Sequence, residues 1–181
     1  MLNKDKHQVI LIKILKEIYS DPEIRTVLGF KGGTAAYLFY RLPRFSVDLD
    51  FDLLDETKKD LILKKMPSIL NPLGKIIEAT EKKYTLFFLL SYEKSERKIK
   101  IEISKRPVKG HFETKNYLGI PILLIKKEAM VAGKLAAFLT RKKFAARDLF
   151  DLWFFLKNDW EIDEEFFENK TGFSLKQGLK K

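Results

Sequence analysis

The spacing of apolar and polar residues predicts a chain that alternates between helices and strands. Apolar residues recur every three or four positions over residues 9–19, as in an amphipathic helix, and Asp21-Pro22 ends this pattern. Residues 86–90 are almost continuously apolar, which is typical of a strand covered on both faces. The patterns together predict helices over residues 9–19, 35–41 and 55–70, and strands over residues 27–31, 47–54, 75–80, 85–92 and 98–104.

The C-terminal part of the chain has a different character. From about Ile125 the pattern is helical to the end, with Trp153, Phe154 and Phe155 as candidate core residues. The strongest break between the two parts lies near Arg106-Pro107. We therefore expect an α/β fold in which residues 1–106 form a small mixed sheet with helices and residues 107–181 form a helical region.

Three aspartates alternate along the predicted strand over residues 47–54. Because successive strand side chains point to opposite faces, Asp48, Asp50 and Asp52 share one face. Two carboxylates about 4 Å apart repel by roughly 4 kcal/mol at an effective dielectric constant of about 20, so a cation normally accompanies them. Oxygen ligands favour a hard divalent ion, Mg²⁺ or Mn²⁺, at Asp48 and Asp50, with Asp52 outside the ligand set or exposed. The alternative is an acidic edge that faces solvent.

A glycine turn precedes this strand, in Lys31-Gly32-Gly33-Thr34. Glycines let backbone amides approach a phosphate closely, and the N-terminus of a helix favours negative charge. Thr34 is a candidate N-cap for the helix over residues 35–41. The glycine turn, the helix and the acidic strand together predict a metal-dependent site for a nucleoside triphosphate.

The order of these motifs resembles the nucleotidyltransferase superfamily, whose hallmark is a glycine turn, a short helix and a strand bearing Asp-x-Asp. More narrowly, the chain is similar to the AbiEii/AbiGii toxin family, in which the turn reads Lys-Gly-Gly-Thr and Arg-x-Ser precedes the strand. Both features are present, as Lys31 to Thr34 and as Arg44 and Ser46. The resemblance implies a polymerase-β-like nucleotidyltransferase core with a small mixed sheet, and a C-terminal helical bundle that completes the active site.

A third carboxylate is expected on a neighbouring strand, because two-metal phosphoryl transfer uses an acid to activate the attacking hydroxyl. Glu102 alternates with isoleucines on the last predicted strand, and the resemblance implies an acid near this position. We therefore predict Glu102 as the general base and as a third metal ligand. The alternative is an exposed strand residue that pairs with Lys100.

A second signature lies in the C-terminal region. Lys134 and Arg141 are seven residues apart, and Asp148 and Asp151 are three apart, so each pair shares a helix face. The resemblance implies that Lys134 holds the triphosphate and that the aspartates complete the active site, where positive groups offset phosphate charge. The alternative is an ion-pair network that braces two helices, and the aspartates could also orient the two cations.

Ser46 lies two residues before Asp48 on the same strand face. Some relatives with this serine are silenced by phosphorylation, since a dianion would repel an incoming triphosphate; the alternative role is to cap the loop after Pro43. The predicted catalytic residues are Asp48, Asp50, Glu102, Lys134 and Asp148, and the predicted nucleotide-binding residues are Gly32, Gly33, Thr34, Ser46, Arg141 and Asp151.

The chain of 181 residues has a net charge of +10 and no cysteine. Because the predicted site is acidic, the excess cations lie elsewhere, in residues 94–109, 141–147 and 176–181. They form either a groove for an RNA backbone or solvated lysine-rich faces. His7 and His111 lie outside every motif and are expected at the surface. No stretch reaches the about 20 apolar residues of a membrane span, which favours a soluble, cytoplasmic protein.

By resemblance, the reaction transfers NMP from an NTP to a hydroxyl. The acceptor is then the 3′ end of tRNA or another RNA, the protein is a toxin, and a cognate antitoxin accompanies it. One alternative is a small-molecule nucleotidyltransferase of the antibiotic-modifying type, against which the basic surface argues mildly. Another is a non-catalytic module that binds RNA or a protein partner, against which Asp48, Asp50 and Lys134 argue.

Overall fold

The computed structural model describes residues 3–108, 110–141, 143 and 145–180. Lys109, Lys142 and Lys181, which belong to the basic segments, lie outside the described residues. The chain divides into two compact units, Met1–Leu124 and Ile125–Lys181.

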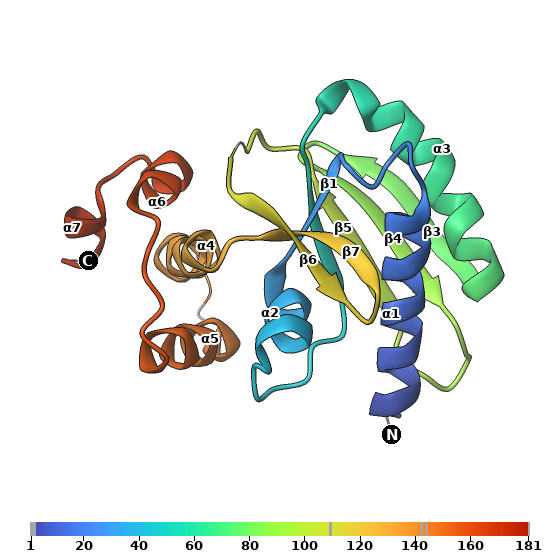
Figure 1. The fold of residues 1–181 in the computed structure, drawn as a ribbon, viewed down its shortest axis with the longest axis horizontal. Helices are drawn as coiled ribbons and strands as arrows, with labels where there is room; N and C mark the ends of the chain where they lie inside the picture. The colour runs from blue at the N-terminus through green and yellow to red at the C-terminus, as the bar shows by residue number, and fades with distance from the viewer. Residues whose placement is uncertain (1–2, 109, 142, 144, 181) are drawn as a thin grey trace. The chain divides into compact units, whose positions relative to one another are not determined.

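A mixed sheet forms the centre of the N-terminal unit (Figure 1). Its strands are β1 Leu28–Lys31, β2 Leu49–Leu53, β3 Lys75–Lys82, β4 Thr85–Ser91, β5 Ile99–Ser104, β6 Phe112–Tyr117 and β7 Ile120–Ile125. Over the described residues, these seven strands have the order β3-β4-β5-β2-β1-β7-β6. β2 and β5 are parallel, as are β1 and β7, whereas β1 and β2 are antiparallel and so are the neighbours among β3, β4 and β5. The predicted mixed sheet is confirmed.

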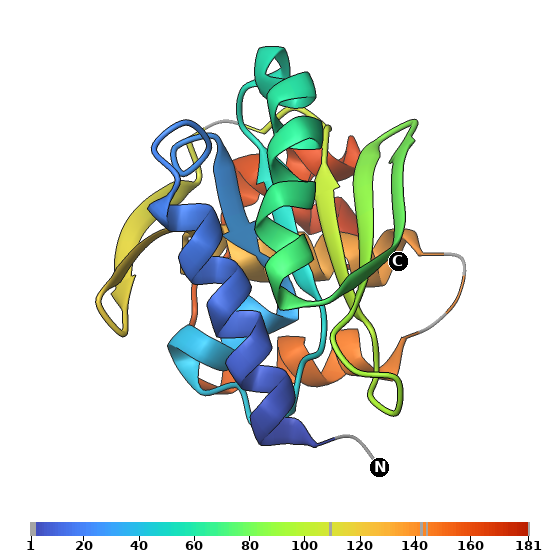
Figure 2. The same cartoon turned by 90° about the vertical axis from the view of Figure 1, so that its right-hand side faces the viewer.

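Two helices cover one face of this sheet. Helices α1 (Lys4–Ser20) and α3 (Lys59–Leu70) lie side by side in front of the strands in Figure 2. A third helix, α2 (Gly32–Tyr40), connects β1 to the segment before β2. The apolar face predicted for α1 is fully buried, through Leu11, Ile14, Leu15 and Ile18.

The ends of the helices follow from their capping residues. α1 begins five residues earlier than predicted, at Lys4 in place of residue 9, because the Asn3 side chain accepts a hydrogen bond from the Lys6 N–H. α1 ends before Asp21, as predicted. The Asp55 side chain accepts a hydrogen bond from the Thr57 N–H and begins a 3₁₀ turn, Glu56–Lys58, that leads into α3.

β5 shows how alternation positions functional side chains. Ile99, Ile101 and Ile103 are fully buried, whereas Lys100 and Glu102 point to the other face and are exposed. The sequence pattern predicted this division, because strand side chains alternate with a period of two. The face of β5 that carries Glu102 is therefore the face opposite the isoleucine core.

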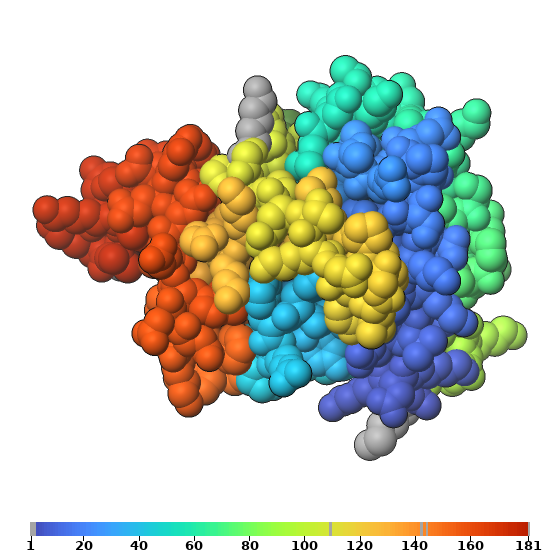
Figure 3. All heavy atoms as spheres, viewed as in Figure 1, coloured from blue at the N-terminus to red at the C-terminus, as the bar shows by residue number. Residues whose placement is uncertain are grey.

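The hairpin of β6 and β7 corrects the predicted start of the helical region at residue 107. Ile120, Ile122 and Leu124 alternate and are buried, so they belong to the sheet. Leu118 and Gly119 both have positive φ, 50° and 83°, as a tight two-residue hairpin turn requires. In Figure 3 the hairpin (yellow) lies against α2 (cyan), which agrees with the hydrogen bond between the Lys115 and Tyr40 side chains.

The C-terminal unit is helical, as predicted from Ile125 onward. Its helices are α4 Lys127–Thr140, α5 Ala146–Lys157, α6 Glu164–Thr171 and α7 Leu175–Gly178. Phe155 is fully buried and stacks on Trp160, with their ring centroids 4.5 Å apart. Trp153 corrects the predicted core, because half of it is exposed on α5. Leu152 and Phe155, three positions apart, form the buried face of α5, and Trp153 lies off that face.

Candidate active site

The glycine turn brings the backbone against the acidic strand. Gly32 has a φ of 82°, and a Cβ atom there would lie only 2.4 Å from Oδ2 of Asp50. Glycine is therefore required for two independent reasons, its left-handed backbone and this close approach. At Gly33, a Cβ atom would lie 2.6 Å from Nη2 of Arg44 and 3.0 Å from Oγ of Ser46. Two side chains of the loop before β2 thus lie over the turn.

Thr34 is not the N-cap that the sequence predicted. α2 begins at Gly32, so Lys31 is the capping residue and Thr34 lies inside the first turn. The Thr34 side chain is fully buried, and its hydroxyl donates a hydrogen bond to the Asp48 carbonyl oxygen. The structure therefore places this hydroxyl against the backbone of the acidic segment, which is a positioning contact.

The predicted carboxylates are neighbours in the sheet. Asp50 of β2 pairs in register with Glu102 of β5, and directly paired residues point to the same face. Asp48 precedes β2, and its Oδ1 accepts a hydrogen bond of 3.3 Å from the Lys100 N–H. The parallel pairing of β2 and β5 is what brings Glu102 beside the aspartates, although 52 residues separate Glu102 from Asp50.

These oxygen donors fit a hard divalent ion by type and by register. Within residues 3–108, 110–141, 143 and 145–180, however, no three acidic or histidine side chains converge closely enough to hold a metal ion. The Asp48 carboxylate is turned toward the Lys100 N–H. The metal-ligand role of Asp48, Asp50 and Glu102 stays a prediction.

Asp52 is buried, so its predicted exposure is wrong, whereas its place outside the metal-ligand set stays a prediction. It is only 1% exposed, and one carboxylate oxygen forms an ion pair with Lys31. The other, Oδ2, is buried without a hydrogen-bond partner among the described residues. A buried carboxylate is costly unless a cation accompanies it, so Asp52 restrains the ammonium group of Lys31, the residue that precedes the glycine turn. Lys31 belongs to the Lys-Gly-Gly-Thr motif but was not among the predicted site residues.

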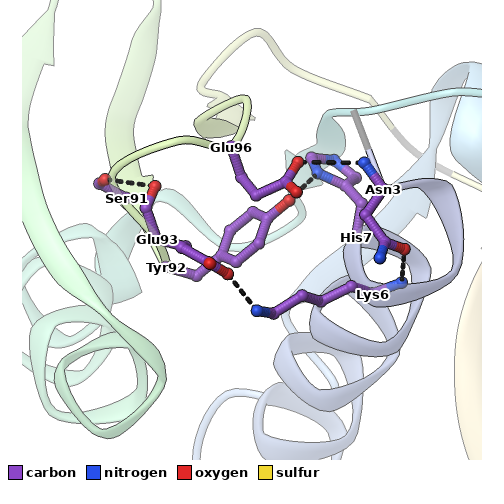
Figure 4. Close-up of polar contacts among 7 residues, drawn as sticks. All are labelled: Asn3, Lys6, His7, Ser91, Tyr92, Glu93 and Glu96. Carbon is purple, nitrogen blue, oxygen red and sulfur yellow. Dashed lines mark hydrogen bonds and ion pairs between the residues drawn. The ribbon is translucent and has the colours of Figure 1, made fainter. Parts of the chain in front are cut away.

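His7 was expected at the surface, but it is fully buried. Figure 4 shows its side chain extending from α1 toward Tyr92 in the loop after β4. Its Nδ1 lies 2.8 Å from the Tyr92 hydroxyl, and its Nε2 lies 2.9 Å from the Val47 carbonyl oxygen. A signal existed in the sequence, because His7 is four positions before Leu11 and therefore continues the apolar face of α1.

The second signature forms a compact ion-pair network in the C-terminal unit. Nζ of Lys134, on α4, lies 3.0 Å from Oδ1 of Asp148 and 2.8 Å from Oδ2 of Asp151, both on α5. Arg141, at the C-terminal end of α4, pairs with the other oxygen of Asp148. The aspartates are 1% and 0% exposed, whereas Lys134 is 16% and Arg141 45% exposed.

The alternative interpretation of this signature, a network that braces two helices, is thus present in the structure. The network also orients the two cations, because both carboxylates are buried and only the basic side chains reach the surface. Direct contact of Asp148 or Asp151 with a substrate would require these pairs to open. A role of Lys134 and Arg141 in nucleotide binding stays a prediction.

Residues 13–177 match the family described as the nucleotidyl transferase AbiEii toxin of type IV toxin–antitoxin systems. The chain belongs to this family. The family predicted from the Lys-Gly-Gly-Thr turn and the Arg-x-Ser segment is therefore confirmed, and the protein is a nucleotidyltransferase. Membership also implies a nucleotide substrate and an antitoxin partner. No curated protein sequence matches the chain significantly.

Solved structures agree with this assignment. JHP933 from Helicobacter pylori is 29% identical, with a TM-score of 0.64, and the alignment covers 92% of this chain and 71% of that protein. MenT4, a nucleotidyltransferase toxin from Mycobacterium tuberculosis, is 20% identical, with a TM-score of 0.66 and coverage of 91% and 62%. The antibiotic-resistance factor ANT(2'')-Ia is 16% identical, with a TM-score of 0.57 and coverage of 93% and 91%. The last two show the fold alone.

None of the described helices combines the length and the apolar character that a membrane span needs.

Proposed function

We propose that this protein transfers NMP from an NTP to a hydroxyl group of RNA, with the 3′ end of tRNA as the acceptor, in a reaction that depends on Mg²⁺ or Mn²⁺. The observation that carries the proposal is the pairing of Asp50 with Glu102 beside Asp48, next to a glycine turn, in a chain of the AbiEii family. Residues of the predicted catalytic set that lie far apart in sequence meet on one face of the sheet.

The chemistry needs a base and a leaving group. The acceptor oxygen attacks the α-phosphorus, the bond to the β-phosphate oxygen breaks, and pyrophosphate leaves. Glu102 accepts the proton of the attacking hydroxyl, since it is exposed on the face that carries Asp50. Asp48, Asp50 and Glu102 would hold the divalent ion, which when bound offsets charge on the reacting phosphate.

Several cations accompany the proposed triphosphate site. The backbone of Gly32 and Gly33 provides close access for phosphates at the start of α2, and Lys31, the residue before Gly32, pairs with the buried Asp52. Arg44 lies over Gly33 and adds a second positive side chain. In the C-terminal unit, Lys134 and Arg141 would neutralise phosphate charge, with Asp148 and Asp151 orienting them.

The charge of the chain supports an RNA acceptor. The chain has a net charge of +10. Five basic residues around β5 are exposed: Lys94, Arg97, Lys98, Lys100 and Arg106. A polyanion gains affinity from such a surface without base contacts. Lys100 shares a face with Glu102, so the basic surface is continuous with the proposed catalytic face.

The test is incubation with each labelled NTP, a divalent ion and total RNA, followed by gel electrophoresis. We expect label from one or two of the four nucleotides in an RNA band of tRNA size, and none when a chelator removes the ion. Label on a small molecule but on no RNA would favour the antibiotic-modifying alternative. The antibiotic-resistance factor ANT(2'')-Ia has a similar fold, which is why this alternative is tested. No label on any acceptor would refute the proposal.

A further inference from the structure

The loop that delivers Asp48 to the sheet is held by side chains from other elements. Residues 41–48 connect α2 to β2 without regular structure, and pairing with β5 begins only at Leu49, opposite Ile101. We propose that His7 is a positioning residue that fixes this loop, so that Asp48 is presented for metal binding and nucleotidyl transfer. The inference rests on the proposed function of Asp48.

The two contacts of His7 assign the proton on its ring. A carbonyl oxygen can only accept, so Nε2, 2.9 Å from the Val47 oxygen, carries the hydrogen and donates it. A ring with this single proton presents Nδ1 as an acceptor, which suits the Tyr92 hydroxyl 2.8 Å away. Both ring nitrogens of a fully buried histidine are therefore satisfied, and the tautomer is fixed by its partners.

Tyr92 is suited to the donor role. Its burial raises the pKa of the hydroxyl, and the nearby carboxylates of Glu96 and Glu93 raise it further, so Tyr92 keeps its proton at neutral pH. The same two glutamates fasten the loop after β4 to the start of α1. Glu96 accepts a hydrogen bond of 3.1 Å from the Asn3 N–H, and Glu93 pairs with Lys6 (Figure 4).

Three anchors converge on the peptide units around Asp48. His7 from α1 holds the Val47 carbonyl, Thr34 from α2 holds the Asp48 carbonyl, and the Lys100 N–H of β5 holds the Asp48 carboxylate. The His7 contact acts on the carbonyl of the peptide bond that leads directly into Asp48. Loss of this anchor would let the peptide plane rotate and would move the Asp48 carboxylate away from the Lys100 N–H.

Aromatic side chains pack against the His7 ring, which is itself fully buried. The ring centroid of His7 lies 5.8 Å from that of Phe45 and 5.4 Å from that of Tyr92, both edge to face. Phe45 belongs to the same loop and packs on Tyr37 of α2, with centroids 5.5 Å apart. A hydrogen bond in such a low-dielectric cluster is stronger than one in water, so a single histidine can restrain the loop.

The test compares side chains that replace one ring nitrogen each. His7→Gln places an amide N–H near the position of Nε2 and can donate to Val47, whereas His7→Asn reaches only the position of Nδ1. His7→Leu removes both contacts. The matched control is Tyr19→Phe on the same helix, because the Tyr19 hydroxyl is also buried and donates to a backbone carbonyl, that of Leu28, far from the loop.

Each variant is assayed for kcat, for the nucleotide KM, and for Mn²⁺ affinity by electron paramagnetic resonance, all per folded molecule. We expect His7→Leu and His7→Asn to lower kcat and Mn²⁺ affinity about tenfold or more, the effect of removing a group that orients a ligand. The nucleotide KM should change little. His7→Gln should restore most of both losses, and Tyr19→Phe should lower stability only. If His7→Leu fails to fold, the comparison of His7→Gln with His7→Asn decides.

The outcomes separate this inference from the proposed function. If the unmodified protein binds Mn²⁺ and all His7 variants bind it equally well per folded molecule, His7 is only a core residue and the inference is overturned. If the unmodified protein neither transfers a nucleotide nor binds Mn²⁺, the proposed function has failed and the inference fails with it.

Discussion

Removal of the Lys134 ammonium should weaken the fold as well as the reaction. Lys134→Met keeps the length and volume of the side chain but takes away the cation that contacts Asp148 and Asp151. Both carboxylates are almost fully buried, and removal of one partner of a buried ion pair costs about 3–5 kcal/mol because a charge is left uncompensated. Arg141 still contacts Asp148, so we expect the lower end, about 3 kcal/mol.

The loss is measurable by urea unfolding and by thermal melting. For a chain of this length, about 3 kcal/mol lowers Tm by roughly 6–12 °C. Lys134→Arg keeps the charge and is the conservative control. The double variant Lys134→Met/Asp151→Asn removes one carboxylate together with the cation, so it should recover about 1–2 kcal/mol relative to Lys134→Met.

The double variant also separates the two roles of Lys134. If it regains stability but still fails to transfer nucleotide, while Asp151→Asn alone stays active, Lys134 acts on the triphosphate as well as on the helices. If it regains both, the network is only a structural brace. A loss below about 1 kcal/mol in Lys134→Met, the value of an exposed ion pair, would refute the reasoning about buried charge.

Three further predictions address the other parts of the site. Asp50→Asn should abolish transfer and leave Tm unchanged or higher, since it relieves repulsion between carboxylates; full activity in a transfer assay would refute the metal assignment. Gly32→Ala should lose more stability than Gly119→Ala in urea unfolding. Both residues have positive φ, where an alanine is strained by about 1–2 kcal/mol. Only at Gly32 would the new Cβ atom also lie 2.4 Å from Oδ2 of Asp50. Equal losses would show that the close approach is unimportant. Neutralising exposed Arg97 and Lys98 together should flatten the log–log salt dependence of RNA binding by about one to two units and spare nucleotide binding. An unchanged slope would remove these cations from the RNA-binding surface.

Local patterns predicted most of the elements and the family. Alternation along β5 assigned Ile101 to the core and Glu102 to the opposite face, because the period of a strand is a local property. The Lys31-Gly32-Gly33-Thr34 turn, with Arg44 and Ser46 before the Asp48-x-Asp50 segment, predicted the family that the comparisons confirm. The β6–β7 hairpin was missed, although its Leu118-Gly119 turn between alternating apolar residues is a hairpin signal.

By itself, the sequence determined which residues carry charge and which face of each regular element is apolar, since both depend on residue type and spacing along the chain. The tertiary structure alone decided which partners those residues meet. It paired Asp50 with Glu102 across parallel strands, buried Asp52 against Lys31, and placed His7 beneath the loop that ends at Asp48. Such contacts depend on strand order and on the packing of distant segments, which no spacing along the chain encodes.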